Sequence, residues 1–314
     1  MAIFKVIFLA LFSTLYLFSS DAVSRDLKYP SGTPSALEIM KNVYYVNHFY
    51  AFKNYSIDKK RRNVTVIVKK SAGEKPLTET VTRYLNNSYS DGVVQSKDLA
   101  IFHSGKNKGL GMLITDYVDD DKSQLYLAWI PALRKIRRFA QPAHEDAWGG
   151  TAFTFGDVTL RKPRHETHSY LGKEKFAQKT GAIELKNSER RGYLRRIPSE
   201  SDKNIGKEVY KVKSTTKFSG WWYDYRISFV DTETFGDYRV EYYKGGKLVK
   251  ILDKYWGSFK GTRDPRALKW GFWYAKDMNT GFESMAYIPN GITKVNQKLP
   301  ASKWSEGTLK KIKR

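Results

Sequence analysis

The histidine run at 165–168 has the residue types of a zinc-peptidase motif but not its spacing. The run has the sequence His-Glu-Thr-His, so its two histidines are three positions apart. A zinc site of this kind needs two histidines four positions apart on one face of a helix. On a strand, residues three positions apart point to opposite faces. We therefore interpret this run as part of a polar loop and predict no metal site.

A second group, His144, Glu145 and Asp146, has side chains suited to general acid and base catalysis. No Ser or Cys nucleophile stands in a recognisable turn near it, and the chain contains no cysteine. The group follows Pro142, so a solvated turn is the favoured interpretation. A hydrolase that acts on envelope lipid or glycan through His144, Glu145, Asp146 or His165 is the alternative function.

Two other patterns also lack what their chemistry requires. The acidic run Asp119–Asp121 lacks the spaced carboxylates and the final Glu of a calcium-binding EF-hand loop, so it is interpreted as a hairpin turn. The segment Gly105–Gly111 is rich in glycine, but no Ser or Thr follows its lysine and no helix follows the segment. It is therefore not a phosphate-binding loop, and the sequence predicts no cofactor.

Cationic side chains are concentrated in the segment Leu133–Arg138. Its apolar residues fit either a helix or a strand, but the preceding Ile130-Pro131 turn favours a strand. Arginine binds phosphate through two parallel hydrogen bonds, or pairs with acidic neighbours across a sheet. Candidates for contact with an anionic headgroup or partner are Arg134, Arg137 and Arg138.

Aromatic side chains make up 15% of the chain and occur in dense groups. The groups at 221–225 and 270–274 place rings on both faces of their predicted strands. A sheet that faces water on one side would have polar residues on that face. We therefore expect each face to meet apolar material, either a large aromatic core or a core and a ligand. Candidates for lining an apolar cavity are Tyr126, Trp129, Trp148, Phe153, Phe155, Trp222 and Trp273.

The N-terminus has the pattern of a secretory signal peptide. Lys5 precedes an apolar run at 6–18, and small residues stand at the positions that signal peptidase recognises, which predicts cleavage near Ala22. An exported chain with no cysteine suits a Gram-negative periplasm. The formal net charge of +23 favours anionic partners. In the periplasm these partners are lipids and acidic proteins, so nucleic acid is excluded by compartment.

The rest of the chain, residues 23–314, is predicted to form a single domain. A short helix is expected at 35–43, where Ser35 and Glu38 have the spacing of a capping box. A basic, irregular insertion is expected near 161–206, with short strands at 167–171 and 182–186. Period-two segments with turn residues between them predict the other strands. These are 64–68, 79–85, 98–103, 110–117, 124–129, 207–213, 223–231, 237–243, 247–252, 268–275 and 282–288.

Two stretches resemble the core signature of the periplasmic outer-membrane lipoprotein-sorting proteins, whose fold is that of the lipoprotein carrier and acceptor. The first, Leu125–Phe139, has the sequence LYLAWIPALRKIRRF, and the second, Trp148–Asp157, has WGGTAFTFGD. The likeness extends over nearly the whole mature chain. It departs from the family at Ala152 and Gly156, where Asp and Glu are usual, while Asp157 is kept.

The resemblance implies a mainly β fold with a few helices. The expected architecture is an unclosed antiparallel β-barrel of about eleven strands, wrapped over helices and enclosing an apolar cavity for acyl chains. The implied function is a monomeric, non-enzymatic carrier of lipid or lipoprotein acyl chains for outer-membrane sorting or export. The implied partner is an inner-membrane exporter of the resistance-nodulation-division type. A subunit that docks such an exporter is a further alternative.

Overall fold

The computed structural model describes residues 23–181 and 183–312. The predicted signal peptide and its cleavage site near Ala22 lie outside the described residues. Within the described residues, no helix combines the length and the apolar character needed to cross a membrane.

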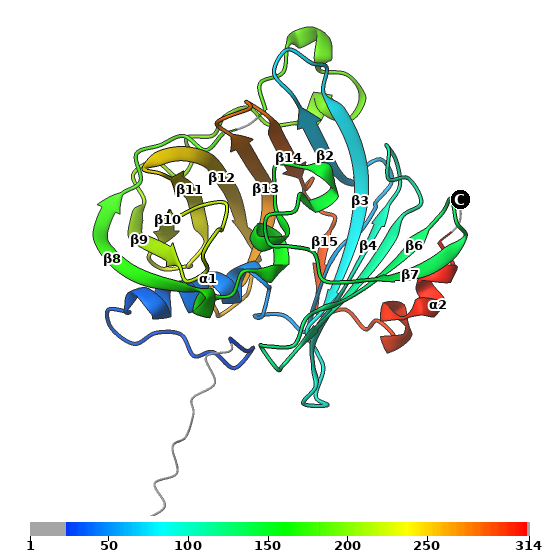
Figure 1. The fold of residues 1–314 in the computed structure, drawn as a ribbon, viewed down its shortest axis with the longest axis horizontal. Helices are drawn as coiled ribbons and strands as arrows, with labels where there is room; N and C mark the ends of the chain where they lie inside the picture. Colours follow the sequence, from blue (N-terminus) through cyan, green and yellow to red (C-terminus); the bar gives the residue numbers. More distant parts are fainter. Residues whose placement is uncertain (1–22, 182, 313–314) are drawn as a thin grey trace, which may run out of the picture.

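The described strands form one curved, antiparallel sheet with two free ends (Figure 1). Along the sheet the order is β7-β6-β5-β4-β3-β2-β14-β13-β12-β11-β10-β9-β8. β1 pairs with both β3 and β15 beside this path. The strands are β1 (Asn54–Ile57), β2 (Thr65–Lys70), β3 (Leu77–Asn86), β4 (Val94–Phe102), β5 (Gly111–Tyr117), β6 (Leu125–Ile130), β7 (Lys135–Phe139), β8 (Glu166–Lys175), β9 (Glu208–Thr216), β10 (Tyr225–Asp231), β11 (Asp237–Lys244), β12 (Lys247–Ser258), β13 (Leu268–Asp277), β14 (Glu283–Tyr287) and β15 (Thr293–Val295).

The mainly β, unclosed antiparallel architecture is confirmed, but the expected number of strands is wrong. The described residues contain fifteen strands rather than about eleven. The strand expected at 167–171 is confirmed as part of β8. The strands β1 and β15 were not predicted, because they are too short to show a clear alternation in the sequence. The strand expected at 182–186 is absent from its described residues, because Ile183 and Leu185 satisfy their apolar character by packing without pairing.

The helices lie toward the two ends of the sheet. α1 (Ala36–Asn47) begins with the predicted capping box of Ser35 and Glu38. Its apolar side packs on Tyr210 and Val212 of β9 and on neighbouring residues of β10 and β13. α2 (Glu306–Lys310) lies against β5, β6 and β7. The described residues therefore do not show the expected wrapping of a barrel over several helices.

The two faces of the sheet have different neighbours. We call the face that carries Ile67 of β2 and Trp273 of β13 the inner face, because these residues line a cavity. The outer face carries Val66 and Val68, which pack with residues from 183–197 of the basic insertion. The insertion therefore covers the outer face of the sheet at β2, β14 and β13.

β13 confirms the prediction that rings stand on both faces of its strand. A register shift in the pairing of β12 with β13 places Trp256 opposite Trp270 and Tyr255 opposite Phe272. As a result, Trp270 and Trp273 both line the cavity on the inner face. Phe272 belongs to the apolar cluster on the outer face.

Candidate ligand-binding site

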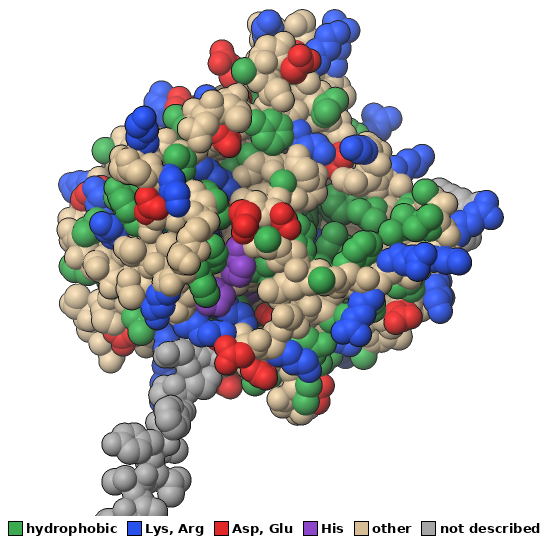
Figure 2. Space-filling view, viewed as in Figure 1, with side chains coloured by type: hydrophobic (Ala, Val, Ile, Leu, Met, Phe, Trp, Pro, Cys, Tyr) green, Lys and Arg blue, Asp and Glu red, His purple; other side chains and the backbone are tan. Residues whose placement is uncertain are grey.

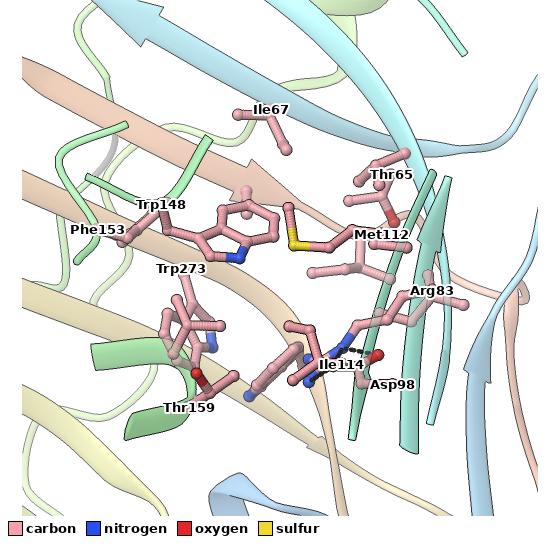
Figure 3. Close-up of a pocket in the computed structure, with 17 residues that line it drawn as sticks. Thr65, Ile67, Arg83, Asp98, Met112, Ile114, Trp148, Phe153, Thr159 and Trp273 are labelled. Atoms are coloured by element: carbon pink, nitrogen blue, oxygen red, sulfur yellow. Dashed lines mark hydrogen bonds and ion pairs between the residues drawn. The ribbon is translucent and has the colours of Figure 1, made fainter. Parts of the chain in front are cut away.

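An apolar cavity of about 70 Å³ lies on the inner face of the sheet (Figure 3). Strands β2 to β5 form one wall of the cavity, and β13 and β14 form the adjacent wall. A segment that crosses the inner face of the sheet covers the cavity on the side opposite the strands. Polar groups in the lining are few, and apart from Thr65, Thr159 and one ion pair the lining is apolar. The apolar lining residues are Ile57, Ile67, Val81, Ala100, Met112, Ile114, Trp148, Phe153, Val158, Trp270, Trp273, Ala286 and Ile288.

The segment that closes the cavity, residues 141–160, is called the covering segment here. It contains the turns η1 (Trp148–Gly150) and η2 (Gly156–Leu160). Gly149 and Gly150 have φ angles of 58° and 69°, values that glycine adopts without steric cost. They reverse the chain, so that the Trp148 amide donates a hydrogen bond to the Phe153 carbonyl at 2.8 Å. This reversal brings both rings over the sheet.

Ring packing and a few hydrogen bonds hold the covering segment on the sheet. Phe153 meets Trp273 edge to face, with ring centroids 5.8 Å apart. The Ala152 amide donates to Oγ of Ser284 in β14 at 2.9 Å, and Nζ of Lys69 in β2 donates to the Gly149 carbonyl at 3.3 Å. Hydrogen bonds of this kind contribute about 1 kcal/mol each, so the rings carry most of the closure.

One ion pair interrupts the apolar lining. Nε of Arg83 donates to both carboxylate oxygens of Asp98, at 3.1 and 2.8 Å, and Nη2 lies 2.7 Å from one of them (Figure 3). The Arg83 guanidinium also lies 4.9 Å from the ring centroid of Trp270. The two charges of the pair therefore neutralise each other. The Trp270 ring beside the guanidinium also lines the cavity.

The predicted aromatic residues fall into three groups. Trp148, Phe153 and Trp273 line the cavity. Tyr126 and Phe155 pack edge to face beside it, with centroids 5.9 Å apart, in a cluster that includes the lining residue Ile114.

The other two aromatic candidates lie elsewhere. Trp129 packs on the outer face with Ile136, in the cluster that contains α2 residue Leu309. Trp222 stacks on Tyr242 with a centroid distance of 4.7 Å. The structure therefore brings five of the seven predicted rings to the cavity or its edge.

The predicted cationic cluster lies on the edge strand β7 and in the turn before it. Arg134, Arg137 and Arg138 are all exposed, and no described acidic side chain forms an ion pair with them. Arg137 stands opposite Ala128 on the side of Tyr126, while Arg138 stands opposite Leu127 on the other side. Figure 2 shows hydrophobic side chains over this part of the molecule, with Lys and Arg side chains around the rim.

The inner face also carries a buried ionic cluster, formed by Asp157, Arg161, Glu166, Arg226, Tyr242 and Lys250. Nζ of Lys250 donates to the Asp157 carboxylate, and the Tyr242 hydroxyl donates to the same carboxylate at 2.6 Å. Burial raises the pKa of Asp157, but the positive charges of Lys250 and Arg161 outweigh it and hold the pKa well below its usual range. The Asp157 carboxylate is therefore charged although it is buried.

Glu166 and Arg226 form the second pair of the cluster. Nη2 of Arg226 lies 2.6 Å from Oε2 of Glu166, and Nε lies 2.8 Å from Oε1. The Tyr223 hydroxyl donates to Oε1 at 2.9 Å. Burial raises the pKa of Glu166, but the charge and hydrogen bonds of Arg226 outweigh it, and the pKa falls to about 2. This pair ties β8 to β10.

The two histidines of the alternative hydrolase, His144 and His165, lie next to each other in the folded chain. The rings of His144 and His165 meet edge to face with centroids 5.3 Å apart. Burial lowers the pKa of each to about 4, so both are neutral near pH 7. Nδ1 of His165 accepts a hydrogen bond from the Lys162 amide at 3.2 Å. Among the described residues, no group of three or more His, Cys, Asp or Glu side chains is placed to hold a metal ion.

Sequence reasoning missed the ion pair of the cavity and the buried ionic cluster. Arg83 and Asp98 stand on neighbouring strands, and Asp157 and Lys250 are far apart in the chain. The available signal was a charged residue in a strand whose other residues are apolar, as at Arg83 in β3. That signal marks a position for attention but does not name its partner.

Solved structures that resemble this chain include an outer-membrane lipoprotein-sorting domain and two further proteins. A putative lipoprotein-sorting domain from Vibrio parahaemolyticus is 15% identical, with 88% of this chain and 98% of that chain covered and a TM-score of 0.62. A DUF1329 family protein from Desulfovibrio piger is also 15% identical, covers 88% and 100%, and has a TM-score of 0.64. A LolA superfamily protein from Nitrosomonas europaea is 10% identical, covers 88% and 100%, and has a TM-score of 0.52.

These likenesses confirm the predicted fold resemblance: the chain has the fold of the LolA superfamily and of the lipoprotein-sorting domains. Residues 94–256, just over half of the chain, match a family model described as "-like: Uncharacterized protein". The chain belongs to that family. None of the curated proteins matches the chain.

Proposed function

We propose that this protein is a non-enzymatic periplasmic carrier of lipid or lipoprotein acyl chains, serving outer-membrane sorting or export. The observation that carries the proposal is the apolar cavity on the inner face, with Trp148, Phe153 and Trp273 in its lining. The lipoprotein-sorting fold supports it by analogy, although one fold serves many functions. A carrier needs an apolar site and reversible access, and no reacting group.

The cavity is too small, as it stands, for a whole acyl chain. Its volume of about 70 Å³ is below the roughly 150 Å³ of an engineered protein cavity that binds benzene. A chain therefore enters by displacing side chains, above all Trp148 of the covering segment and the flexible Met112 of β5. Burial of an acyl chain yields about 0.8 kcal/mol per CH₂, which for ten methylenes outweighs the few polar contacts of the covering segment.

Native mass spectrometry of protein extracted gently from the cell envelope tests the proposal. The wild type should carry bound lipid. The variant Ala286→Phe, which fills the cavity from β14, should carry much less. Ala301→Phe places the same ring on an exposed position away from the cavity and serves as the matched control. An empty wild-type protein, or equal loading of all three, would contradict the carrier function.

The alternative hydrolase makes an opposite prediction. Turnover of a phospholipid panel that disappears in His144→Ala would support it, because His144 and His165 are the neutral bases that the structure brings together. Lipid that is bound and released unchanged supports a carrier.

Periplasmic localisation, a monomeric state and docking to an exporter of the resistance-nodulation-division type are parts of the same proposal. The signal-peptide pattern supports periplasmic localisation, and the net charge of +23 supports docking. Cell fractionation tests the localisation, and light scattering tests the monomeric state. Retention of an exporter in a pull-down should weaken as salt rises, because surface charge pairs are screened; retention that salt leaves unchanged would argue against docking through the basic surface.

A further inference from the structure

A second cavity, polar and of about 50 Å³, lies next to the apolar one. Its charged lining residues are Asp157, Arg161, Lys162, Arg226, Asp237 and Lys254. Thr159 of η2 lines both cavities, so the two adjoin at this turn of the covering segment. An amphiphile whose tail enters the apolar cavity can therefore place its polar end here.

Most cations of the polar cavity contact a carboxylate other than Asp157. Lys162 contacts Asp120 at 2.6 Å, and Arg164, which shares Asp120, also contacts Asp121 at 2.7 Å. Lys254 contacts Asp237 at 2.7 Å. Arg226 is held by Glu166 at 2.6 Å. In each of these pairs the carboxylate neutralises the cation, so no excess positive charge remains for a ligand.

Arg161 is the exception. Among the described acidic side chains, it contacts only Asp157, at 3.4 Å, and it shares this carboxylate with the closer Lys250. Two cations and one anion leave one positive charge in excess. The Arg161 side chain is 10% exposed, so water compensates this charge only in part.

The Arg161 guanidinium is also held in place before any ligand arrives. Its Nη2 donates to the Tyr242 hydroxyl at 2.9 Å. Its central carbon lies 5.4 Å from the ring centroid of Tyr242 and 5.9 Å from that of Tyr223. A planar guanidinium with fixed orientation binds a carboxylate or phosphate through two parallel hydrogen bonds.

We propose that the polar cavity binds the anionic headgroup of the carried amphiphile, and that Arg161 is its principal contact. The inference rests on the proposed carrier function and adds a ligand class, an acyl chain that ends in carboxylate or phosphate oxygens. A cavity of about 50 Å³ has room for a group of roughly one or two water molecules in size, which suits such an end group.

Titration calorimetry with dodecanoate, dodecanol, dodecyl phosphate and inorganic phosphate tests the proposal at pH 8. The wild type should bind the two anionic amphiphiles about 10-fold more tightly than dodecanol, the range expected for one charge-assisted hydrogen-bonding group. Similar gains for both anions would show a general anion site, and a larger gain for one identifies the preferred headgroup. Inorganic phosphate alone should bind far more weakly, because it lacks the tail.

Variants then assign the effect to Arg161. In Arg161→Gln, the anionic preference should disappear while dodecanol binding stays unchanged. Arg161→Lys keeps the charge without the planar fork and should retain part of the preference. Arg263→Gln removes the same charge from an exposed segment between β12 and β13 and should change nothing. Lys250 still neutralises Asp157 in Arg161→Gln, so this variant should fold, and circular dichroism checks that it does.

The outcomes separate the two proposals. Equal binding of dodecanoate and dodecanol by the wild type overturns the headgroup site and leaves the carrier function standing, whether or not any variant folds. Binding of none of the amphiphiles overturns the carrier function itself. Inorganic phosphate that binds as tightly as dodecyl phosphate would show a site for a free anion and overturn the link to the carried chain.

Discussion

The apolar cavity and the buried ionic cluster lie side by side on one inner face, yet they are stabilised in opposite ways. The cavity is lined by side chains that attract one another weakly and without direction, so it tolerates empty space and exchange of neighbours. Most charges of the cluster depend on a particular partner, such as Glu166 for Arg226. The apolar wall can therefore rearrange around a ligand, whereas the paired charges of the cluster must keep their partners.

Loss of a carboxylate from the ionic cluster should have the largest effect on stability. Glu166→Gln leaves the Arg226 charge buried without its counter-ion, and such changes cost about 3–5 kcal/mol. Urea denaturation monitored by tryptophan fluorescence measures the free energy of unfolding. Glu174 lies on β8, like Glu166, and forms an exposed pair with Lys211 of β9. Glu174→Gln should cost about 0.5 kcal/mol or less. Equal stability of the two variants would show that the cluster is not needed for the fold.

Truncation in the apolar cavity should cost less and improve ligand uptake. Met112→Ala removes a flexible side chain from the lining and should cost about 2 kcal/mol, at the low end for such truncations because Met112 is only partly buried. The enlarged space should bind an apolar dye more tightly than the wild type does. Weaker dye binding by Met112→Ala would show that Met112 contacts the ligand instead of blocking it.

Acidification should weaken the pair of His144 and His165 and the buried ionic cluster in separate pH ranges. The folded pKa of His144 and His165 is about 4, below the unfolded value of 6.5, so their contribution is full above pH 6.5 and is lost as the pH falls toward 4. Glu166, with a folded pKa of about 2 against 4.5 unfolded, loses its contribution below pH 4.5.

Unfolding free energies measured from pH 8 to pH 3 check this order. His144→Gln should make the profile less steep between pH 6.5 and 4, while His48 and His165, each with a folded pKa of about 4, keep part of the slope. The steeper fall below pH 4.5 should not change. A wild-type profile that is flat down to pH 4.5 would show that the histidines do not contribute.

The exposed arginines should have the smallest effect. Arg137→Gln should change the free energy of unfolding by no more than about 0.5 kcal/mol, because its side chain is exposed and has no acidic partner among the described residues. The same denaturation experiment measures it. A loss larger than 1 kcal/mol would place Arg137 among the residues that brace the sheet.

Features set by neighbouring residues in the chain were predictable. The Ser35 and Glu38 capping box fixed the start of α1, and the two glycines between β11 and β12, with φ angles of 54° and 74°, fixed a hairpin turn. The aromatic pattern also identified Trp148, Phe153 and Trp273, because large rings in an exported β protein need an apolar neighbour.

Features set by distant partners were not predictable. Asp157 was visible as a retained acidic residue, but its partner Lys250 lies on β12 and became apparent only in the folded sheet. The short strands β1 and β15 pair with each other from opposite ends of the chain. The register shift that turns Trp270 toward the cavity skips Gly271 of β13. A glycine inside a strand indicates a bulge, but it does not tell which face the neighbouring rings take.

The position of β7 at the edge of the sheet gives its cationic side chains a second role. In the part of the chain that the structure describes, β7 pairs with β6 alone, so its other edge offers unpaired amide and carbonyl groups to any passing strand. Three of its five residues are Lys135, Arg137 and Arg138. Two copies that approached each other along this edge would bring like charges together. Mutual repulsion of this kind keeps an open sheet from growing into a polymer of its own copies.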